Sequence, residues 1–173
     1  MKRLGILVLG LLIGGCATMP YSRPDATAQL KNAQGDAVGV AALWEDEGGV
    51  RFFADVRGIP PGQHGIHLHA VGKCEPPDFT SAGGHFNPTG KKHGLANPDG
   101  PHAGDLPNIT VGADGTGQLN YLVPGVTLGS GAASLFDAGG TAVVIHAGPD
   151  DYTTDPAGNS GARIACGVIQ KEP

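Results

Sequence analysis

Short apolar runs separated by turn-forming residues make up most of the chain. In residues 50–57 the even positions are apolar, and three of the four odd positions are charged. This side-chain period of two predicts a strand with one buried and one exposed face. No apolar pattern with the spacing of a helix persists in the sequence. Seven further strands are predicted at residues 28–31, 38–45, 65–71, 108–112, 117–123, 141–147 and 164–170.

Composition and the gaps between the predicted strands indicate how the strands are joined. The chain has 30 glycines and 14 prolines among 173 residues, and the glycines fall between the apolar runs, as turns between strands should. Short strands with frequent turns predict a single all-β domain, a sandwich or a flattened barrel, over residues 28–173. Residues 72–106 and 148–163 fit no strand, and loops of that length in a compact domain are usually functional.

The first residues have the pattern of an export signal. A basic start is followed by an almost purely apolar run over residues 4–13, which is too short to span a bilayer as a helix. The small residues before Cys16 resemble a lipobox, where bacterial lipoprotein signal peptidase cuts ahead of a lipid-modified cysteine. We expect a lipoprotein signal peptide at residues 1–15 and a lipidated Cys16 with a flexible tether at residues 16–27. The alternative is an ordinary signal peptide cut elsewhere, with Cys16 discarded or free.

Charge and cysteine content narrow the function classes. The formal net charge is −5 and no basic stripe occurs, so nucleic-acid binding is not expected. Three cysteines are an awkward number for an exported protein, but lipid on Cys16 would leave Cys74 and Cys166 as a pair that can close in an oxidising compartment. The alternatives are two reduced buried thiols or a thiolate metal site, although close CxxC-type spacing is missing.

Histidines gather in one part of the chain with a spacing that suits metal binding. His67 and His69 are two residues apart on a predicted strand, so both imidazoles can meet one metal, although two exposed strand histidines would have the same spacing. The long loop then supplies His85, His93, His102 and Asp105. Three imidazoles and one carboxylate make a closed tetrahedral zinc set, which would order a loop rich in glycine and proline. The alternative is a set of solvated loop histidines.

Seven segments resemble, in order, the successive signatures of the copper/zinc superoxide dismutase family. They are His67-Leu68-His69, Cys74, Gly84-His85-Phe86-Asn87-Pro88, Lys92-His93-Gly94, His102-Ala103-Gly104-Asp105-Leu106, Val144-Ile145-His146 and Gly158-Asn159-Ser160-Gly161-Ala162-Arg163-Ile164-Ala165-Cys166-Gly167. The resemblance covers residues from about 28 to 170, and residues 150–156 are similar to the bacterial branch. It implies an eight-stranded Greek-key β-barrel or sandwich of immunoglobulin-like architecture.

The resemblance implies a role for each ligand-type residue. The copper ligands would be His67, His69, His85 and His146. The zinc ligands would be His85, His93, His102 and Asp105. His85 would thus bridge one copper and one zinc ion per subunit, and Asp150 would link His67 to His93. His64 would have a structural place beside the ligands, and the family's disulfide bond would join Cys74 to Cys166.

The implied activity is that of an oxidoreductase that converts two superoxide ions and two protons to O₂ and hydrogen peroxide. Copper would exchange electrons, while zinc would hold His85, which would be both ligand and proton donor. The Arg163 guanidinium would offer two parallel donors to the small anion, although a surface salt bridge is the commoner role of an arginine. Anchored by lipid on Cys16, facing the periplasm or at the cell surface, the enzyme would protect the cell envelope from superoxide. Both a monomer and a homodimer fit the sequence.

Two other function classes compete with this interpretation. A non-enzymatic copper- or zinc-binding surface lipoprotein could keep the same scaffold, but such a protein would be expected to lack a ligand or the arginine, and none is missing here. A hydrolytic zinc enzyme needs an open coordination position and a general base, whereas this zinc set already has four protein ligands.

Overall fold

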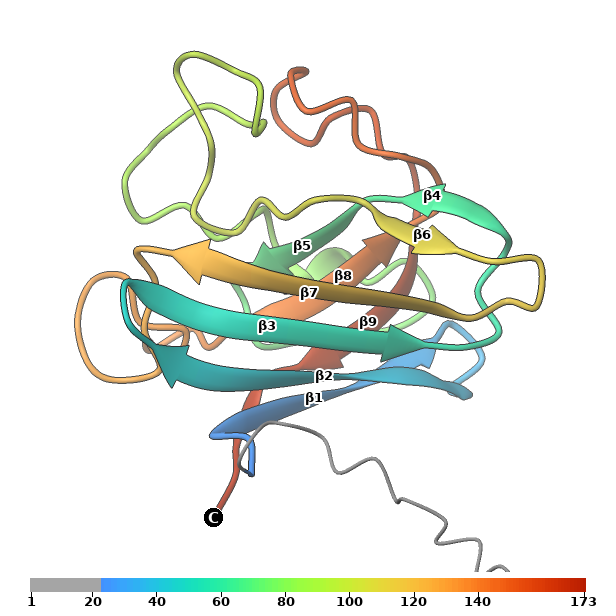
Figure 1. Cartoon of the computed structure of the whole chain (residues 1–173), viewed down its shortest axis with the longest axis horizontal. Coiled ribbons are helices and arrows are strands. Elements are labelled where there is room, and N and C mark those ends of the chain that lie inside the picture. The colour runs from blue at the N-terminus through green and yellow to red at the C-terminus, as the bar shows by residue number, and fades with distance from the viewer. Residues whose placement is uncertain (1–22) are drawn as a thin grey trace, which may run out of the picture.

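Residues 23–173 are described by a computed structural model (Figure 1). The strands are β1 (Ala26–Asn32), β2 (Ala37–Asp46), β3 (Gly49–Val56), β4 (Gly62–His64), β5 (Ile66–His69), β6 (Ile109–Val111), β7 (Gly117–Pro124), β8 (Ala142–His146), β9 (Arg163–Val168) and β10 (Gln170–Lys171). The eight predicted strands all form, and β4 and β10 are additional. These two have only three and two residues, too few to produce an alternating pattern. Among the described residues, no helix is long and apolar enough to cross a membrane.

The strands form one sheet that nearly closes on itself, which confirms the predicted all-β barrel. Its order is β4-β6-β7-β3-β2-β1-β9-β8-β5, and β10 pairs with β1. The two end strands, β4 and β5, are separated in sequence by Gly65 alone, so the ends of the sheet meet there. Gly65 donates its N–H to the Gly148 carbonyl and accepts a hydrogen bond from the His146 N–H, both at 2.8 Å. A side chain at this position would press against the Ser160 Cβ at 2.9 Å.

The core lies inside the barrel and follows from the alternation in the strands. In β3 the even positions, such as Phe52 and Ala54, are fully buried, whereas Arg51 and Phe53 on the other face are half-buried. On β5 and β8, one set of alternate residues contributes to the same core, including Leu68 and Ile145. The remaining residues of these two strands point to the outside of the barrel, yet they are also buried. Something other than the sheet must therefore cover the outer face of β5 and β8.

The cover is formed by the two long loops, confirming that residues 72–106 and 148–163 are mostly irregular. A short 3₁₀ turn, η1 (Thr80–Ala82), lies in the first loop, and β9 begins at the end of the second. The later part of the first loop (yellow-green) and the second loop (orange-red) lie beside each other on the same side of the barrel, at the top of Figure 1. The N–H of Ala96 donates to the Tyr152 carbonyl at 3.0 Å and joins the two loops.

The start of the first loop is fastened to the outer face of β8 and β9. A small apolar cluster of Phe79, Ala82, Ala142, Val144 and Cys166 packs there, apart from the main core. Cys74 forms a disulfide bond with Cys166, with the Cα atoms 5.6 Å apart. The pair is therefore closed, and the alternatives of free thiols or a thiolate metal site do not hold. This packing fixes the loop residues that lie closest to the histidines.

Candidate metal centre

The first histidine group lies on the outer face of β5 and β8. His67 and His69 project from β5 on the side opposite to Leu68, and His146 ends β8, the neighbouring strand. His85 comes from the first loop and pairs with His69 in an isolated antiparallel bridge. The ring centroids of His67 and His85 are 4.1 Å apart, and those of His67 and His146 are 4.9 Å apart. The strand and the loop therefore bring four imidazoles into one buried group.

One nitrogen of each of these four rings is buried and has no hydrogen-bond partner among the described residues. These atoms are His67 Nδ1, His69 Nε2, His85 Nε2 and His146 Nε2. They all lie within 4.8 Å of one another. Leaving a polar atom buried and unpaired costs about 1–3 kcal/mol, so four convergent ones indicate a bound group that satisfies them. A nitrogen-only set of four suits copper.

In each ring, the hydrogen bond made by one nitrogen determines whether the other nitrogen has a lone pair available for a metal. His69 Nδ1–H donates to the Gly83 carbonyl at 2.9 Å, and His146 Nδ1–H donates to the Gly161 carbonyl at 3.1 Å. Because a carbonyl can only accept, each ring must carry its proton on Nδ1, which leaves a lone pair on Nε2. Burial lowers the pKa of His67 to about 3, of His69 to about 2 and of His146 to about 4. These rings are therefore neutral near pH 7, as metal binding requires.

The second group lies between the two loops and shares His85 with the first. It consists of His85 Nδ1, His93 Nδ1, His102 Nδ1 and Asp105 Oδ1. The three nitrogens lie 2.8, 3.1 and 3.3 Å from the carboxylate oxygen, and His85 Nδ1 is 3.4 Å from His102 Nδ1. Donors about 2.0–2.1 Å from a central zinc ion form a tetrahedron with edges of roughly 3.3 Å. The spacing therefore fits a four-ligand zinc site.

The charges in and beside the second group favour a bound cation. Burial alone would raise the pKa of Asp105, but the hydrogen bonds from His85, His93 and the Gly94 N–H hold it well below its usual range. Burial likewise disfavours the charged form of His93, yet the hydrogen bonds and charges of Asp105 and Asp150 outweigh it and raise the pKa to about 9. A cation bound here would take the place of that proton.

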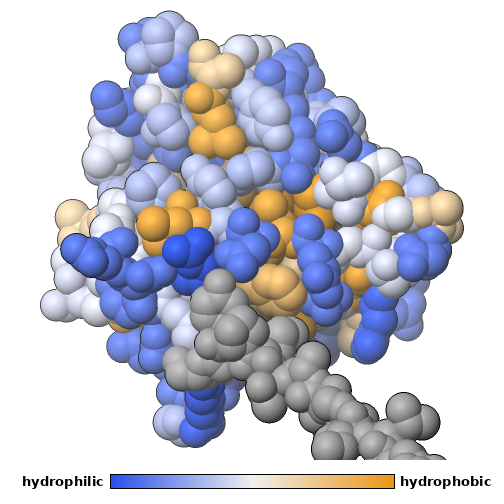
Figure 2. All heavy atoms as spheres, viewed as in Figure 1, coloured by the Kyte–Doolittle hydropathy of each residue, from blue (hydrophilic) through white to orange (hydrophobic). Residues whose placement is uncertain are grey.

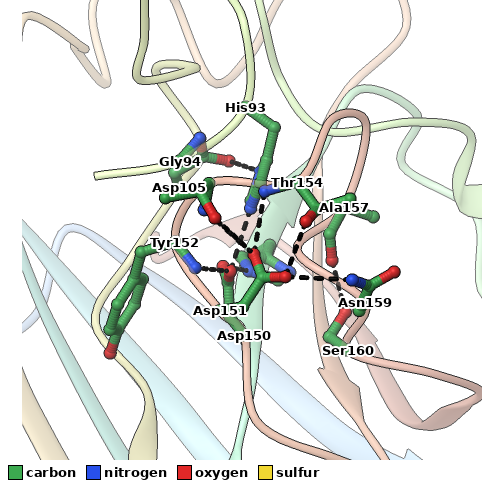
Figure 3. Close-up of polar contacts among 12 residues, drawn as sticks. His93, Gly94, Asp105, Asp150, Asp151, Tyr152, Thr154, Ala157, Asn159 and Ser160 are labelled. Atoms are coloured by element: carbon green, nitrogen blue, oxygen red, sulfur yellow. Dashed lines mark hydrogen bonds and ion pairs between the residues drawn. The ribbon is translucent and has the colours of Figure 1, made fainter. Parts of the chain in front are cut away.

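Asp150 connects the two groups through the ring nitrogens that face away from them. His67 Nε2–H donates to its Oδ2 at 2.8 Å, and His93 Nε2–H donates to its Oδ1 at 3.0 Å. The Tyr152 N–H donates to the same Oδ1 at 2.7 Å (Figure 3). These ring nitrogens carry protons, so His67, His93 and Asp150 join the two groups and do not form a third metal site, although their atoms are close enough for one.

Two segments hold His85 and Asp105 beside β5. The Phe86 N–H donates to the Leu68 carbonyl at 2.8 Å, and the Leu68 N–H donates to the Gly104 carbonyl at 2.9 Å. A Cβ on Gly104 would collide with the Leu68 backbone oxygen, so glycine is required at this close approach. The motif around each ligand therefore provides both the ligand and its backbone attachment.

His64 is buried close to these groups without joining either. Its Nδ1 lies 2.8 Å from the His146 carbonyl oxygen, and its Nε2 lies 2.8 Å from the Pro60 carbonyl oxygen. Both ring nitrogens are thus engaged with the backbone.

Arg163 is held at the edge of the first group by backbone carbonyls. Nη1 donates to the Phe79 carbonyl and Nη2 to the Gly83 carbonyl, both at 2.7 Å. The Gly83 carbonyl also accepts the hydrogen bond from His69, so the guanidinium and a ring of the first group share one anchor. Arg163 and Asp78 line a surface hollow of about 400 Å³. Arg163 is paired with no carboxylate in a salt bridge among the described residues.

Sequence reasoning assigned no role at the site to two further residues, Asp155 and Asn108. Asp155 accepts a hydrogen bond from the His93 N–H at 2.8 Å, and Asn108 binds the backbone of Asp150 through its side-chain amide. Both act on backbone groups far away in sequence, for which a motif carries no signal. Cys16, expected to carry lipid, lies outside the described residues.

Comparison with known proteins agrees with this geometry. A family profile described as copper/zinc superoxide dismutase (SODC) matches residues 37–169. Superoxide dismutase (Cu-Zn) 2 of Aquifex aeolicus (strain VF5) is 50% identical over 172 residues, which are 98% of this chain and 100% of that protein. A superoxide dismutase (Cu-Zn) of Caulobacter vibrioides is 41% identical over 165 residues, 94% of this chain and 95% of that protein.

Solved structures lead to the same group of proteins. The crystal structure of a double mutant of a SOD-like protein from Bacillus subtilis has a TM-score of 0.79 at 46% identity and covers 82% of this chain and 95% of that chain. Cu/Zn superoxide dismutase from Brucella abortus has a TM-score of 0.67 at 29% identity, over 84% of this chain and 99% of that chain. The chain therefore belongs to the copper/zinc superoxide dismutase family and is an oxidoreductase whose substrate is superoxide.

Proposed function

We propose that this chain dismutates superoxide at a copper–zinc pair that shares His85. The copper ligands would be His67, His69, His85 and His146. The zinc ligands would be His85, His93, His102 and Asp105. The observation that carries the proposal is the set of four buried imidazole nitrogens that converge without partners among the described residues. A non-enzymatic metal-binding protein would not need Arg163 held beside such a set.

The chemistry converts two superoxide ions and two protons into O₂ and hydrogen peroxide. Copper, when bound, supplies the one-electron exchange with superoxide. His85 is the residue that handles the proton, because its Nε2 faces the copper set while its Nδ1 faces the zinc set. A proton held at Nε2 lies inside the copper pocket, where the reduced dioxygen anion can accept it.

Arg163 supplies the binding site for the anion. A guanidinium has five N–H donors, and the two carbonyl contacts leave others free to face the hollow that it lines. Its orientation is set before substrate arrives, so little ordering is needed on binding. A local positive group of this kind can draw in an anion even though the chain as a whole carries a net charge of −5.

The same proposal places the enzyme outside the cytoplasm, attached to a membrane by lipid on Cys16, where it would protect the cell envelope. The disulfide bond between Cys74 and Cys166 supports an oxidising compartment. The apolar leader and the small residues before Cys16 support lipidation. Replacement of Cys16 by Ser should release the protein from the membrane fraction and abolish labelling with a radioactive fatty acid. Retention of both in the Cys16→Ser variant would count against the anchor.

Superoxide decay after a radiolytic pulse tests the catalytic proposal. The full chain, in mild detergent and loaded with copper and zinc, is compared with the His69→Ala variant, and metal content is measured for both. We expect decay close to the diffusion limit for the unmodified chain and a large loss for the variant. Slow decay of the unmodified chain at full metal occupancy would overturn the proposal in favour of a metal-binding lipoprotein.

A further inference from the structure

Asn108 lies just before β6, on the barrel, and holds the backbone of Asp150 from both sides. Its Nδ2 donates to the Asp150 carbonyl at 2.9 Å, and its Oδ1 accepts from the Asp150 N–H at 2.8 Å. These are the hydrogen bonds that a neighbouring strand would make, supplied here by one side chain. The side chain of Asn108 therefore attaches the backbone of Asp150, in the second loop, to the barrel.

A second contact at the same place strengthens this attachment. The Asn108 N–H donates to the Tyr152 hydroxyl at 2.7 Å, and the Tyr152 N–H donates to the Asp150 carboxylate at 2.7 Å. Tyr152 has a left-handed backbone conformation with φ of 64°, which is uncommon for a residue with a side chain. Asn108, Asp150 and Tyr152 thus form a closed ring of hydrogen bonds, which we call the Asn108 clamp.

The opposite side of the Asp150 carboxylate leaves no room for movement. Gly158 lies against it with φ of 61°, and a Cβ there would collide with Asp150 Oδ1 and approach His93 Nε2 to 2.7 Å. The carboxylate is therefore enclosed between the Asn108 clamp and the backbone of Gly158. On its remaining side the carboxylate binds the two histidine rings, one from each metal group.

We propose that Asn108 is a positioning residue that acts through Asp150 to keep both metal groups in binding geometry. The inference rests on the proposed ligand sets, since His67 and His93 belong to the copper and zinc sets respectively. With the backbone of Asp150 fixed, its carboxylate holds the Nε2–H of both rings, and each Nδ1 then faces its own group. Without the clamp, the Asp150 carboxylate is no longer held in place, and neither histidine ring is fixed in its orientation.

Removal of the clamp should therefore weaken metal binding. Loss of a residue that orients metal ligands typically costs about 10–100-fold in affinity. The Asn108→Ala variant is expected to bind zinc about 10–100-fold more weakly than the unmodified chain, as measured by competition with a chromophoric chelator. Its Cu(II) electron paramagnetic resonance spectrum should also broaden, because His67 is no longer held in one orientation.

Asn32 provides a matched control. Its side-chain amide also binds backbone groups, accepting from the Gln34 and Asp36 N–H groups at 3.0 and 2.9 Å, but in the turn between β1 and β2. The Asn32→Ala variant should keep the zinc affinity and the copper spectrum of the unmodified chain. Tyr152→Phe removes only the hydroxyl from the clamp and should weaken zinc binding in the same direction by a smaller factor, which provides a second test if Asn108→Ala does not fold.

A double-mutant cycle tests whether Asn108 acts through Asp150. If it does, Asn108→Ala should lower the zinc affinity of an Asp150→Ala variant by less than twofold. Additive losses, or unchanged zinc affinity in both Asn108→Ala and Tyr152→Phe, would overturn the inference. These outcomes are separate from the proposed function, which would fail if the unmodified chain itself bound no zinc or copper.

Discussion

At the scale of single residues, the guanidinium of Arg163 is positioned both by the strand that carries it and by the first loop. Arg163 faces His146 across the β8–β9 pair, and its Nη atoms donate to carbonyls of the first loop. The sequence marks this arginine only by its place in a family motif. In the structure its guanidinium is held by the strand on one side and by the loop on the other.

We expect the Arg163→Ala variant to slow superoxide decay about tenfold or more, because a cleft of local positive charge raises anion capture by that order. Copper and zinc contents should stay unchanged, since Arg163 contacts carbonyl oxygens and no ligand nitrogen. Pulse radiolysis and metal analysis measure the two effects. Arg57→Ala, which removes the same charge from an exposed position, is the control. Loss of metal from the Arg163 variant would show that the residue is structural.

A second prediction concerns the pH dependence of the metal-free protein. Folding raises the pKa of His93 from 6.5 to about 9. The stability that the charged ring contributes is therefore fully present below pH 6.5 and is lost as the pH rises through 9. Burial lowers the pKa of His67, His69 and His146, so these three rings titrate below this window. We expect the free energy of unfolding in urea to fall between pH 6.5 and 9.

Two comparisons test the origin of this pH effect. His93→Gln should remove most of the decrease, because the titrating ring is gone. Zinc should also remove it, since a bound cation keeps the ring neutral over the whole range. A free energy of unfolding that stays constant across the window in the metal-free protein would contradict the assignment of the shift to His93.

At the scale of elements, the sheet provides rigid positions and the loops complete the site. His67, His69 and His146 stand on strands, whereas His85, His93 and the carboxylate of Asp105 come from the first loop. The disulfide bond and the small apolar cluster around Phe79 fasten that loop to β8 and β9. The loop thus needs no regular structure of its own to present its ligands.

The disulfide bond should account for a large part of the stability of the metal-free fold. It joins residues 92 apart in sequence, and closing a loop of that length removes about 4–5 kcal/mol of unfolded-chain entropy. A variant with both Cys74→Ser and Cys166→Ser should lose about that much free energy of unfolding in guanidinium. The reduced unmodified protein is the control and should behave in the same way. An unchanged midpoint would mean that the apolar cluster alone holds the loop.

At the scale of the whole molecule, the barrel and the two long loops, which carry most of the proposed ligands, should respond differently to metal. Strand β3 pairs with β2 along the whole length of β3, and both strands contribute to the main core. The two long loops contact each other mostly through a few hydrogen bonds and the ligand residues. The surface over the barrel mixes hydrophilic residues with smaller apolar areas (Figure 2). Stability is therefore concentrated in the barrel.

Removal of metal with a chelator should loosen the loops and leave the barrel intact. We expect amide hydrogen exchange to speed up in residues 86–106 and 148–162, while β2 and β3 keep their protection. Addition of zinc alone should restore most of the loop protection, because its proposed ligands and their partner Asp155 tie the two loops together. Equal amide exchange rates in the two loops with and without zinc would contradict the view that metal orders the loops and not the barrel.

The sequence by itself determined the strands and the set of ligand types. The alternation in residues 50–57 reappears as β3, because the pleat of a strand sends neighbouring side chains to opposite faces whatever the surroundings. The gaps at residues 72–106 and 148–163 reappear as loops for a related reason, since glycine and proline disfavour regular strands locally. The proposed ligand roles follow from the resemblance to family motifs, each short enough to lie within one local stretch of chain.

Only the tertiary structure decided how these parts meet. The free nitrogen of each ring depends on a partner elsewhere, as with His67 and Asp150, which are 83 residues apart. The Asn108 clamp joins residues 42 apart, and the Asn108 amide binds backbone atoms of Asp150 that every residue possesses. The sequence around Asp150 therefore carries no signal for this contact. Closure of the barrel at Gly65 likewise depends on the register of distant strands. The periodicity of a strand depends only on neighbouring residues, whereas contacts between residues that are distant in sequence form only when the chain folds.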